Sequence, residues 1–133
     1  MEKEQQEILF RLSIFEQQMQ QLQQQLQEVE RGIIEIDFLN KGLDELADGV
    51  DKEVYAPIGR GIFAKTKLVS EKLLVDVGDR NLVTKSIPET KKIIENQIKK
   101  LEEVKKELSN SMEEVNQQIV EIVMSVRESE NKN

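Results

Sequence analysis

The sequence contains no cysteine, no histidine and no tryptophan among its 133 residues. It therefore offers no thiol nucleophile, no imidazole general base and none of the Cys or His ligands that zinc sites use. It also lacks the disulfide framework that stabilises many small secreted domains. Aromatic residues make up only 4% of the chain, so we expect no large compact core. These absences predict a protein that is not an enzyme and that needs no cofactor or metal.

Long apolar runs are also absent. No stretch approaches the roughly 18 apolar residues of a membrane span, and the first ten residues, MEKEQQEILF, lack the basic start and apolar stretch of a signal peptide. Charged residues make up 34% of the chain and the net charge is −7. This balance argues against nucleic-acid binding, because phosphate contacts need clustered Lys and Arg. We expect a cytoplasmic protein with neither membrane nor nucleic-acid partners.

Two arrays of apolar residues, one near each end, recur at alternating spacings of four and three. This period of 3.5 residues is typical of a left-handed coiled-coil seam, and it predicts helices over residues 4–47 and 87–128. We expect residues 129–133 to be disordered. The first seam is Ile8, Leu12, Phe15, Met19, Leu22, Leu26, Val29, Ile33, Ile36, Asn40, Leu43 and Ala47. The second is Ile94, Ile98, Leu101, Lys105, Leu108, Met112, Val115, Ile119, Ile122 and Val126.

Between the helices the apolar period changes to two, which is typical of β-strands. Glycine-containing turns at 59–61 and 78–81 divide residues 54–86 into two predicted β-hairpins. Ser86 and Glu89 have the spacing of a capping box at the start of the second helix. Four short strands do not form a stable core alone, and their free edges need partners. We therefore assign subunit assembly to the apolar strand residues Val54, Ala56, Ile58, Ile62, Ala64, Leu73, Val75, Val77 and Leu82.

The two seams predict which residues pair. If the chain folds back on itself, the numbers of paired seam residues must have a constant sum, and both Ala47 with Ile87 and Ile8 with Val126 give 134. This predicts a single domain over residues 1–133, of the α+β class and mainly α. Its core is a long antiparallel two-helix coiled-coil hairpin with two central β-hairpins. The alternative is parallel pairing between two chains.

Apolar residues also lie off the seam at the open ends of the helices: Leu9, Phe10, Ile14, Val120, Val123 and Met124. Two helices cannot cover every side of such a tip, and exposed apolar surface usually marks an interaction site. From Glu16 to Arg31, by contrast, every residue off the seam is Gln or charged, as expected for a solvated rod. The alternatives at the tip are frayed ends with incidental apolar residues, or contact with a third helix.

The segments YAPIGRGIFAKTKL (55–68) and LLVDVGDRNLVTKSIPETKKIIENQIKKLE (73–102) resemble the hairpins and second-helix start of alpha-type prefoldin subunits, as in archaea. Beta-type subunits of that family carry a single hairpin, so two hairpins favour the alpha type. Ala56 departs from the family pattern, which commonly has Val there. A filament-forming gamma-type relative is the alternative within the family.

The resemblance implies an ATP-independent chaperone in which two alpha-type and four beta-type subunits join through β-barrels. Coiled-coil tips would hold unfolded client proteins and pass them to a group II chaperonin. The rival function is a structural coiled-coil adaptor that binds a folded partner. Off-seam apolar residues at several heptad positions favour the chaperone, because an adaptor would extend a single stripe. The predicted client-binding tip is Ile8, Leu9, Phe10, Leu12, Ile14, Val120, Val123, Met124 and Val126.

Overall fold

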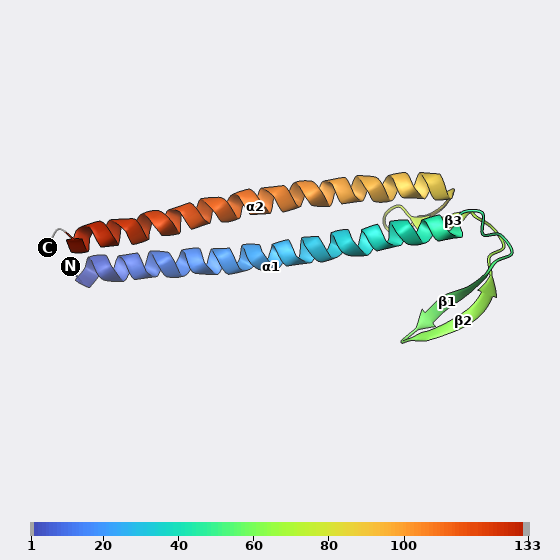
Figure 1. Ribbon diagram of the computed structural model, residues 1–133, viewed down its shortest axis with the longest axis horizontal. Helices are drawn as coiled ribbons and strands as arrows, with labels where there is room; N and C mark the ends of the chain where they lie inside the picture. Colours follow the sequence, from blue (N-terminus) through green and yellow to red (C-terminus); the bar gives the residue numbers. More distant parts are fainter. Residues whose placement is uncertain (1, 132–133) are drawn as a thin grey trace. The chain divides into compact units, whose positions relative to one another are not determined.

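The computed structural model describes residues 2–131. Two long helices flank four short strands along the chain, and this confirms the predicted fold class (Figure 1). The elements in chain order are α1 (Glu2–Leu46), β1 (Glu53–Gly59), β2 (Ile62–Lys67), β3 (Leu73–Asp76), β4 (Leu82–Lys85) and α2 (Ile87–Asn131). The described chain divides into two compact units, a terminal unit of residues 2–33 and 100–131 and a strand unit of residues 34–99.

In the terminal unit, α1 and α2 run antiparallel within one chain. A Cβ placed on Gly32 would lie 3.7 Å from Cδ1 of Leu101. The Lys105 ammonium lies 3.7 Å from the Glu30 carboxylate. The residue numbers of these two pairs add up to 133 and 135, within one of the predicted sum of 134. The helices therefore pair in the register that the seam arithmetic predicts.

The predicted seam is the covered side of both helices in this unit. Val115 and Ile122 are buried, and the other apolar seam residues are half-buried. Lys105 is the exception. It is exposed, because its long side chain carries the ammonium out of the seam to Glu30. The ten Gln residues between positions 5 and 27 belong to the unbroken helix α1 and are exposed.

The core of the strand unit lies where the two helices meet the hairpins. Leu43, Ile87 and Ile94 are buried together, and the Lys91 ammonium pairs with the Asp44 carboxylate beside them. Four half-buried side chains pack against this cluster, and one of them, from β3, ties the second hairpin to the helices. They are Ile36, Leu46, Leu73 and Ile98.

The predicted cap of α2 is present. The Glu89 backbone N–H donates to Oγ of Ser86 at 3.2 Å, and this Oγ donates to Oε1 of Glu89 at 3.1 Å. The Thr90 hydroxyl donates to the Ser86 carbonyl at 2.8 Å and is buried. The Ser86 side chain therefore satisfies one of the free N–H groups in the first turn of α2.

Both hairpins are antiparallel and close through residues with positive φ. The first pairs Ala56 with Ala64 and closes at Gly59, Arg60 and Gly61. Glycine is favoured there because it adopts positive φ without steric cost. These pairings place Val54, Ala56 and Ala64 on one face, as the alternation predicts. The second hairpin pairs β3 with β4.

The second hairpin divides the residues assigned to assembly between its two faces. Val75 is opposite Val83, whereas Leu82 is opposite Asp76. Leu82 therefore shares the other face with Leu74, and both are exposed. The turn at 77–81 sets this register. The Val77 N–H donates to the Asn81 carbonyl at 3.0 Å, which fixes how β3 and β4 pair.

The end of α2 corrects one expectation. We expected residues 129–133 to be disordered, but α2 continues to Asn131. No Gly or Pro follows Val126 to end the helix, and Glu, Ser and Arg are tolerated in helices. Residues 132–133 lie outside the described residues.

Asn40 lies in the seam with its side-chain Oδ1 buried and without a hydrogen-bond partner. Replacing it with Leu should stabilise the protein by roughly 1–2 kcal/mol, because the cost of the unpaired amide oxygen disappears. Urea denaturation followed by circular dichroism measures the change. Asn96→Leu is the matched control, because Asn96 is exposed on α2. A loss of stability in Asn40→Leu would show that the amide has a partner.

Leu22→Ala and Leu108→Ala test the seam of the terminal unit. Each side chain is half-buried, so each substitution should cost roughly 1–3 kcal/mol, less than the 2–5 kcal/mol of a fully buried Leu. Gln24→Glu on the exposed side should change stability by no more than about 0.5 kcal/mol. The same denaturation measurement compares them, and equal losses at Leu22 and Gln24 would contradict the register.

Candidate functional site: an apolar cleft between the helix ends

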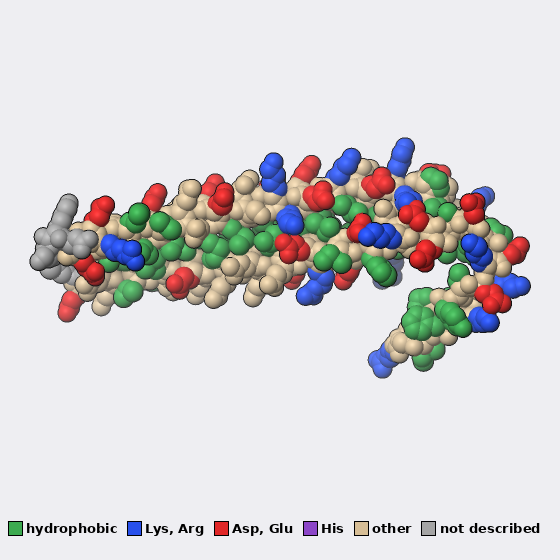
Figure 2. Space-filling view, viewed as in Figure 1, with side chains coloured by type: hydrophobic (Ala, Val, Ile, Leu, Met, Phe, Trp, Pro, Cys, Tyr) green, Lys and Arg blue, Asp and Glu red, His purple; other side chains and the backbone are tan. Residues whose placement is uncertain are grey.

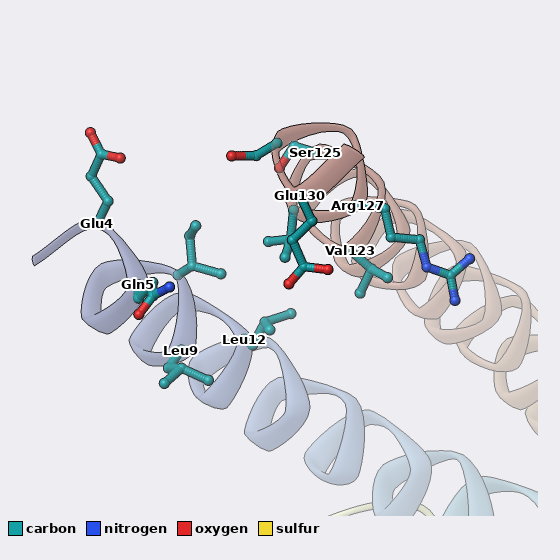
Figure 3. Close-up of a pocket in the computed structure, with 11 residues that line it drawn as sticks. Glu4, Gln5, Leu9, Leu12, Val123, Ser125, Arg127 and Glu130 are labelled. Carbon is teal, nitrogen blue, oxygen red and sulfur yellow. The ribbon is translucent and has the colours of Figure 1, made fainter. Parts of the chain in front are cut away.

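An open cleft of about 620 Å³ lies between the first turns of α1 and the last turns of α2 in the terminal unit. Figure 3 shows Leu9 and Leu12 on α1 and Val123 on α2 at this cleft. The lining residues are Glu4, Gln5, Ile8, Leu9, Leu12, Val123, Ser125, Val126, Arg127, Ser129 and Glu130.

The floor of the cleft is the seam itself. Ile8, Leu12 and Val126 continue the heptad pattern that Phe15 and Ile122 share nearer the middle of the helices. Ile122 is buried, but Ile8, Leu12 and Val126 are only half-buried. At this end the seam side chains therefore line open space instead of closing fully against one another.

Exposed apolar side chains at the cleft and beside it extend this surface. Leu9, Phe10 and Met124 are 65%, 68% and 61% exposed. Ile14 and Val120 are also exposed. Figure 2 shows hydrophobic side chains reaching the surface near this end of the helices. Uncovered apolar area of this kind is typical of a site that binds other proteins.

The predicted tip residues therefore fall into two groups. Five of them line the cleft: Ile8, Leu9, Leu12, Val123 and Val126. The other four lie outside its lining and are exposed: Phe10, Ile14, Val120 and Met124.

Sequence reasoning missed the polar rim of the cleft. Glu4, Gln5 and Arg127 contribute to its walls, as do Ser129 and Glu130 from the segment expected to be disordered. Figure 3 shows the Glu130 side chain reaching into the space between the helices. The lack of Gly or Pro after Val126 was the signal that could have located this last turn.

The strand unit carries a second set of exposed apolar side chains. Of the residues assigned to assembly, Val54, Ala56, Ala64, Leu73 and Val75 are half-buried. The remaining four are exposed in this single chain: Ile58, Ile62, Val77 and Leu82. The two hairpins form separate two-stranded sheets, so each has two unpaired edges within the chain.

The described residues provide no evidence for metal chemistry or for insertion in a bilayer. Over residues 2–131, no group of three or more His, Cys, Asp or Glu side chains is placed to hold a metal ion. In that same range, neither helix is long and apolar enough to cross a membrane.

The sequence profile of the family described as "Prefoldin subunit" matches residues 15–132. The chain belongs to the prefoldin family. The match spans both hairpins, α2 and α1 from Phe15 onward, so it includes the strand unit and the α2 side of the cleft but not the cleft residues of α1.

The relatives identify the type of subunit that the chain resembles. It is 32% identical to the prefoldin subunit alpha of Archaeoglobus fulgidus over 119 residues, which cover 86% of this chain and 85% of that protein. It is 30% identical to the prefoldin subunit alpha of Methanobrevibacter smithii, over 82% of this chain and 75% of that protein. These findings confirm the alpha-type resemblance.

A solved structure shares the fold. The filamentous prefoldin of Methanocaldococcus jannaschii, determined by cryo-electron microscopy, superposes with a TM-score of 0.77 at 22% identity. The match covers 86% of this chain and 96% of that one. This likeness confirms the architecture of two long helices with two small hairpins.

Phe10→Ser and Leu12→Ser distinguish exposed tip residues of this prefoldin from seam residues. Phe10 is exposed and Leu12 is half-buried. Phe10→Ser should therefore change stability by no more than about 0.5 kcal/mol, and Leu12→Ser should cost roughly 1–3 kcal/mol. Urea denaturation measures both. If Phe10→Ser is as costly as Leu12→Ser, Phe10 is packed against another surface.

Proposed function

We propose that this chain is a chaperone subunit that captures unfolded proteins at the open end of its terminal unit. The observation that carries the proposal is the apolar cleft with exposed apolar side chains around it. A folded partner needs one matching stripe. The cleft and the surrounding side chains instead present apolar surface on several sides of both helices, which suits client segments of varied sequence. Met124 adds a flexible, polarisable side chain that adapts to different contacts.

Binding at this surface is shared among many weak contacts. No single exposed side chain would dominate, and several copies of the tip in one assembly would raise the effective affinity through multivalency. This arrangement holds a client without a chemical step, so we propose that capture does not require ATP.

Assembly is proposed to run through the strand unit. Exposed Ile58, Ile62 and Val77 and the free strand edges need covering, and pairing with other subunits would cover them. Named relatives of the alpha type support beta-type subunits as partners. We propose two alpha-type chains with four beta-type chains, and delivery of the client to a group II chaperonin.

A double truncation tests the site of client capture. Removing residues 1–14 and 120–133 deletes the cleft and the exposed side chains around it but leaves the strand unit intact. Assembly with a beta-type subunit, measured by size-exclusion chromatography with light scattering, should persist. Suppression of aggregation of an unfolded client, measured by turbidity, should fall at least fivefold, with or without ATP.

The single variant Phe10→Ser is the control for this truncation and should retain most of the suppression. A truncated protein that assembles correctly and suppresses aggregation fully would overturn capture at the cleft and favour the adaptor function. Long filaments of the chain alone in electron micrographs would favour the gamma-type alternative.

Assembly is tested by placing charges on the second hairpin. Val75→Glu with Val83→Lys alters a cross-strand pair on one face of β3 and β4. The variant should fail to assemble at the wild-type size while its helical circular dichroism changes by less than about 10%. Arg80→Glu, at an exposed position in the turn of the same hairpin and outside the residues assigned to assembly, is the control. Wild-type assembly of the double variant would place the subunit contact elsewhere.

A further inference from the structure

The outward side of α1 in the strand unit carries an apolar surface that none of the roles above uses. Ile34, Phe38 and Leu39 are 70%, 79% and 53% exposed, and we call them the outer patch. Phe38 lies on the side of the helix opposite the seam residues Ile36 and Leu43, by the 3.6-residue helical period. Phe38 is also the most exposed aromatic side chain of the described chain.

The first hairpin has a second apolar face. Pro57 is opposite Phe63 in the β1–β2 ladder, and Tyr55 lies diagonally beside Phe63. These three residues form what we call the aromatic face, with Tyr55 and Phe63 68% and 58% exposed. The other face, which contains Ala56 and Ala64, is the one assigned to assembly. The aromatic face is therefore left without a role and without a cover.

The segments that carry the two surfaces have opposite net charge, with Lys65 paired to Glu53 at 3.1 Å and Asp37 paired to Lys41 at 3.2 Å inside the chain. Residues 34–46 of α1 contain four acidic side chains and one basic one. Residues 52–68, which span the first hairpin, contain four basic side chains and one acidic one. Glu35 is exposed near the outer patch, and Lys65 lies opposite Tyr55 on the aromatic face. Complementary charge of this kind steers association and fixes its register.

The first hairpin of the same chain does not cover the outer patch. Phe38 is 79% and Ile34 70% exposed within the single chain. The base of the hairpin is closed locally, because the Asp51 N–H donates to the Leu68 carbonyl at 2.8 Å and the Leu68 N–H donates to the Lys52 carbonyl at 3.0 Å. The outer patch is therefore available to another molecule.

We propose that the aromatic face of the first hairpin of one copy docks on the outer patch of a second copy of this chain. The aromatic side chains of Phe38, Tyr55 and Phe63 can bury on the order of 150–250 Å² each when fully covered. Because these three side chains, Ile34 and Leu39 are only 53–79% exposed, they form the apolar centre of the contact, and the side chains around them supply the rest of the roughly 1,000 Å² that a specific interface needs. This contact joins a helix to a sheet face, so it is separate from pairing of strand edges.

Engineered disulfides test the contact, because the chain has no cysteine of its own. One copy carries Glu35→Cys and a second, size-tagged copy carries Lys65→Cys. These changes remove one charge from each surface and leave Phe38, Tyr55 and Phe63 intact, so the crosslink reports on the apolar contact. Oxidation of the mixture should produce the tagged–untagged disulfide dimer at least fivefold faster than either control mixture. The controls replace Glu35→Cys with Gln24→Cys on the Gln-rich side of α1, or Lys65→Cys with Thr66→Cys on the other face of β2.

Two further variants complete the test. Phe38→Ser in the Glu35→Cys copy should slow the crosslink to the control rate, because it removes the anchor of the outer patch. A single chain that carries both cysteines should form no disulfide within itself at high dilution. Crosslinking no faster than the controls, or a rapid disulfide within one chain, would overturn the proposal. These results report on the contact whether or not the cleft captures clients.

Discussion

The heptad seam between α1 and α2 is the interaction on which the other features depend. It fixes the antiparallel register, which brings the two ends of the chain together in the terminal unit and brings Leu43 beside Ile87 and Ile94 in the strand unit. Coiled-coil pairing buries one stripe per helix and leaves the other sides free. Side chains outside that stripe are therefore available to solvent or to other proteins. Their type, polar or apolar, changes along the chain.

Because the seam buries only one stripe of each helix, the chain exposes three kinds of surface. The middle of α1 presents Gln and charged side chains, which remain solvated. The open end presents an apolar cleft whose floor is the seam. The strand unit presents hairpins with unpaired edges and apolar faces. Exposed apolar side chains in both units suit a family whose members are subunits.

Periodicity predicted most of this fold. The spacing of four and three located both helices, and the sum of 134 gave their pairing, because a shift by one heptad would leave seam residues at one end without a partner. The cap at Ser86 and the glycine turn at 59–61 were local signals with a direct physical cause. The period of two located the strands, but it could not give the pairing of Val75 with Val83, since that depends on the hydrogen bonds of the turn at 77–81.

The sequence predicted which apolar residues lie at the tip, but it did not predict the cleft between the two helices. Apolar residues off the seam identified the tip, yet the cleft arises because Ile8, Leu12 and Val126 do not close fully, and spacing carries no information about closure. The rim at Ser129 and Glu130 was missed because a polar segment was interpreted as disordered. The outer patch and the aromatic face were visible as exposed residues only once the strand register and the helix faces were known.

The incomplete closure of the seam at the open end has a consequence for local stability. Side chains that line open space contribute less burial energy than those in the cluster around Ile94, so the helix ends can open without unfolding the remainder. Backbone amides near Leu12 and Val126 should then exchange with solvent faster than those near Leu43. In the proposed function this end of the helices meets the unfolded chain, so capture and local folding would be thermodynamically coupled.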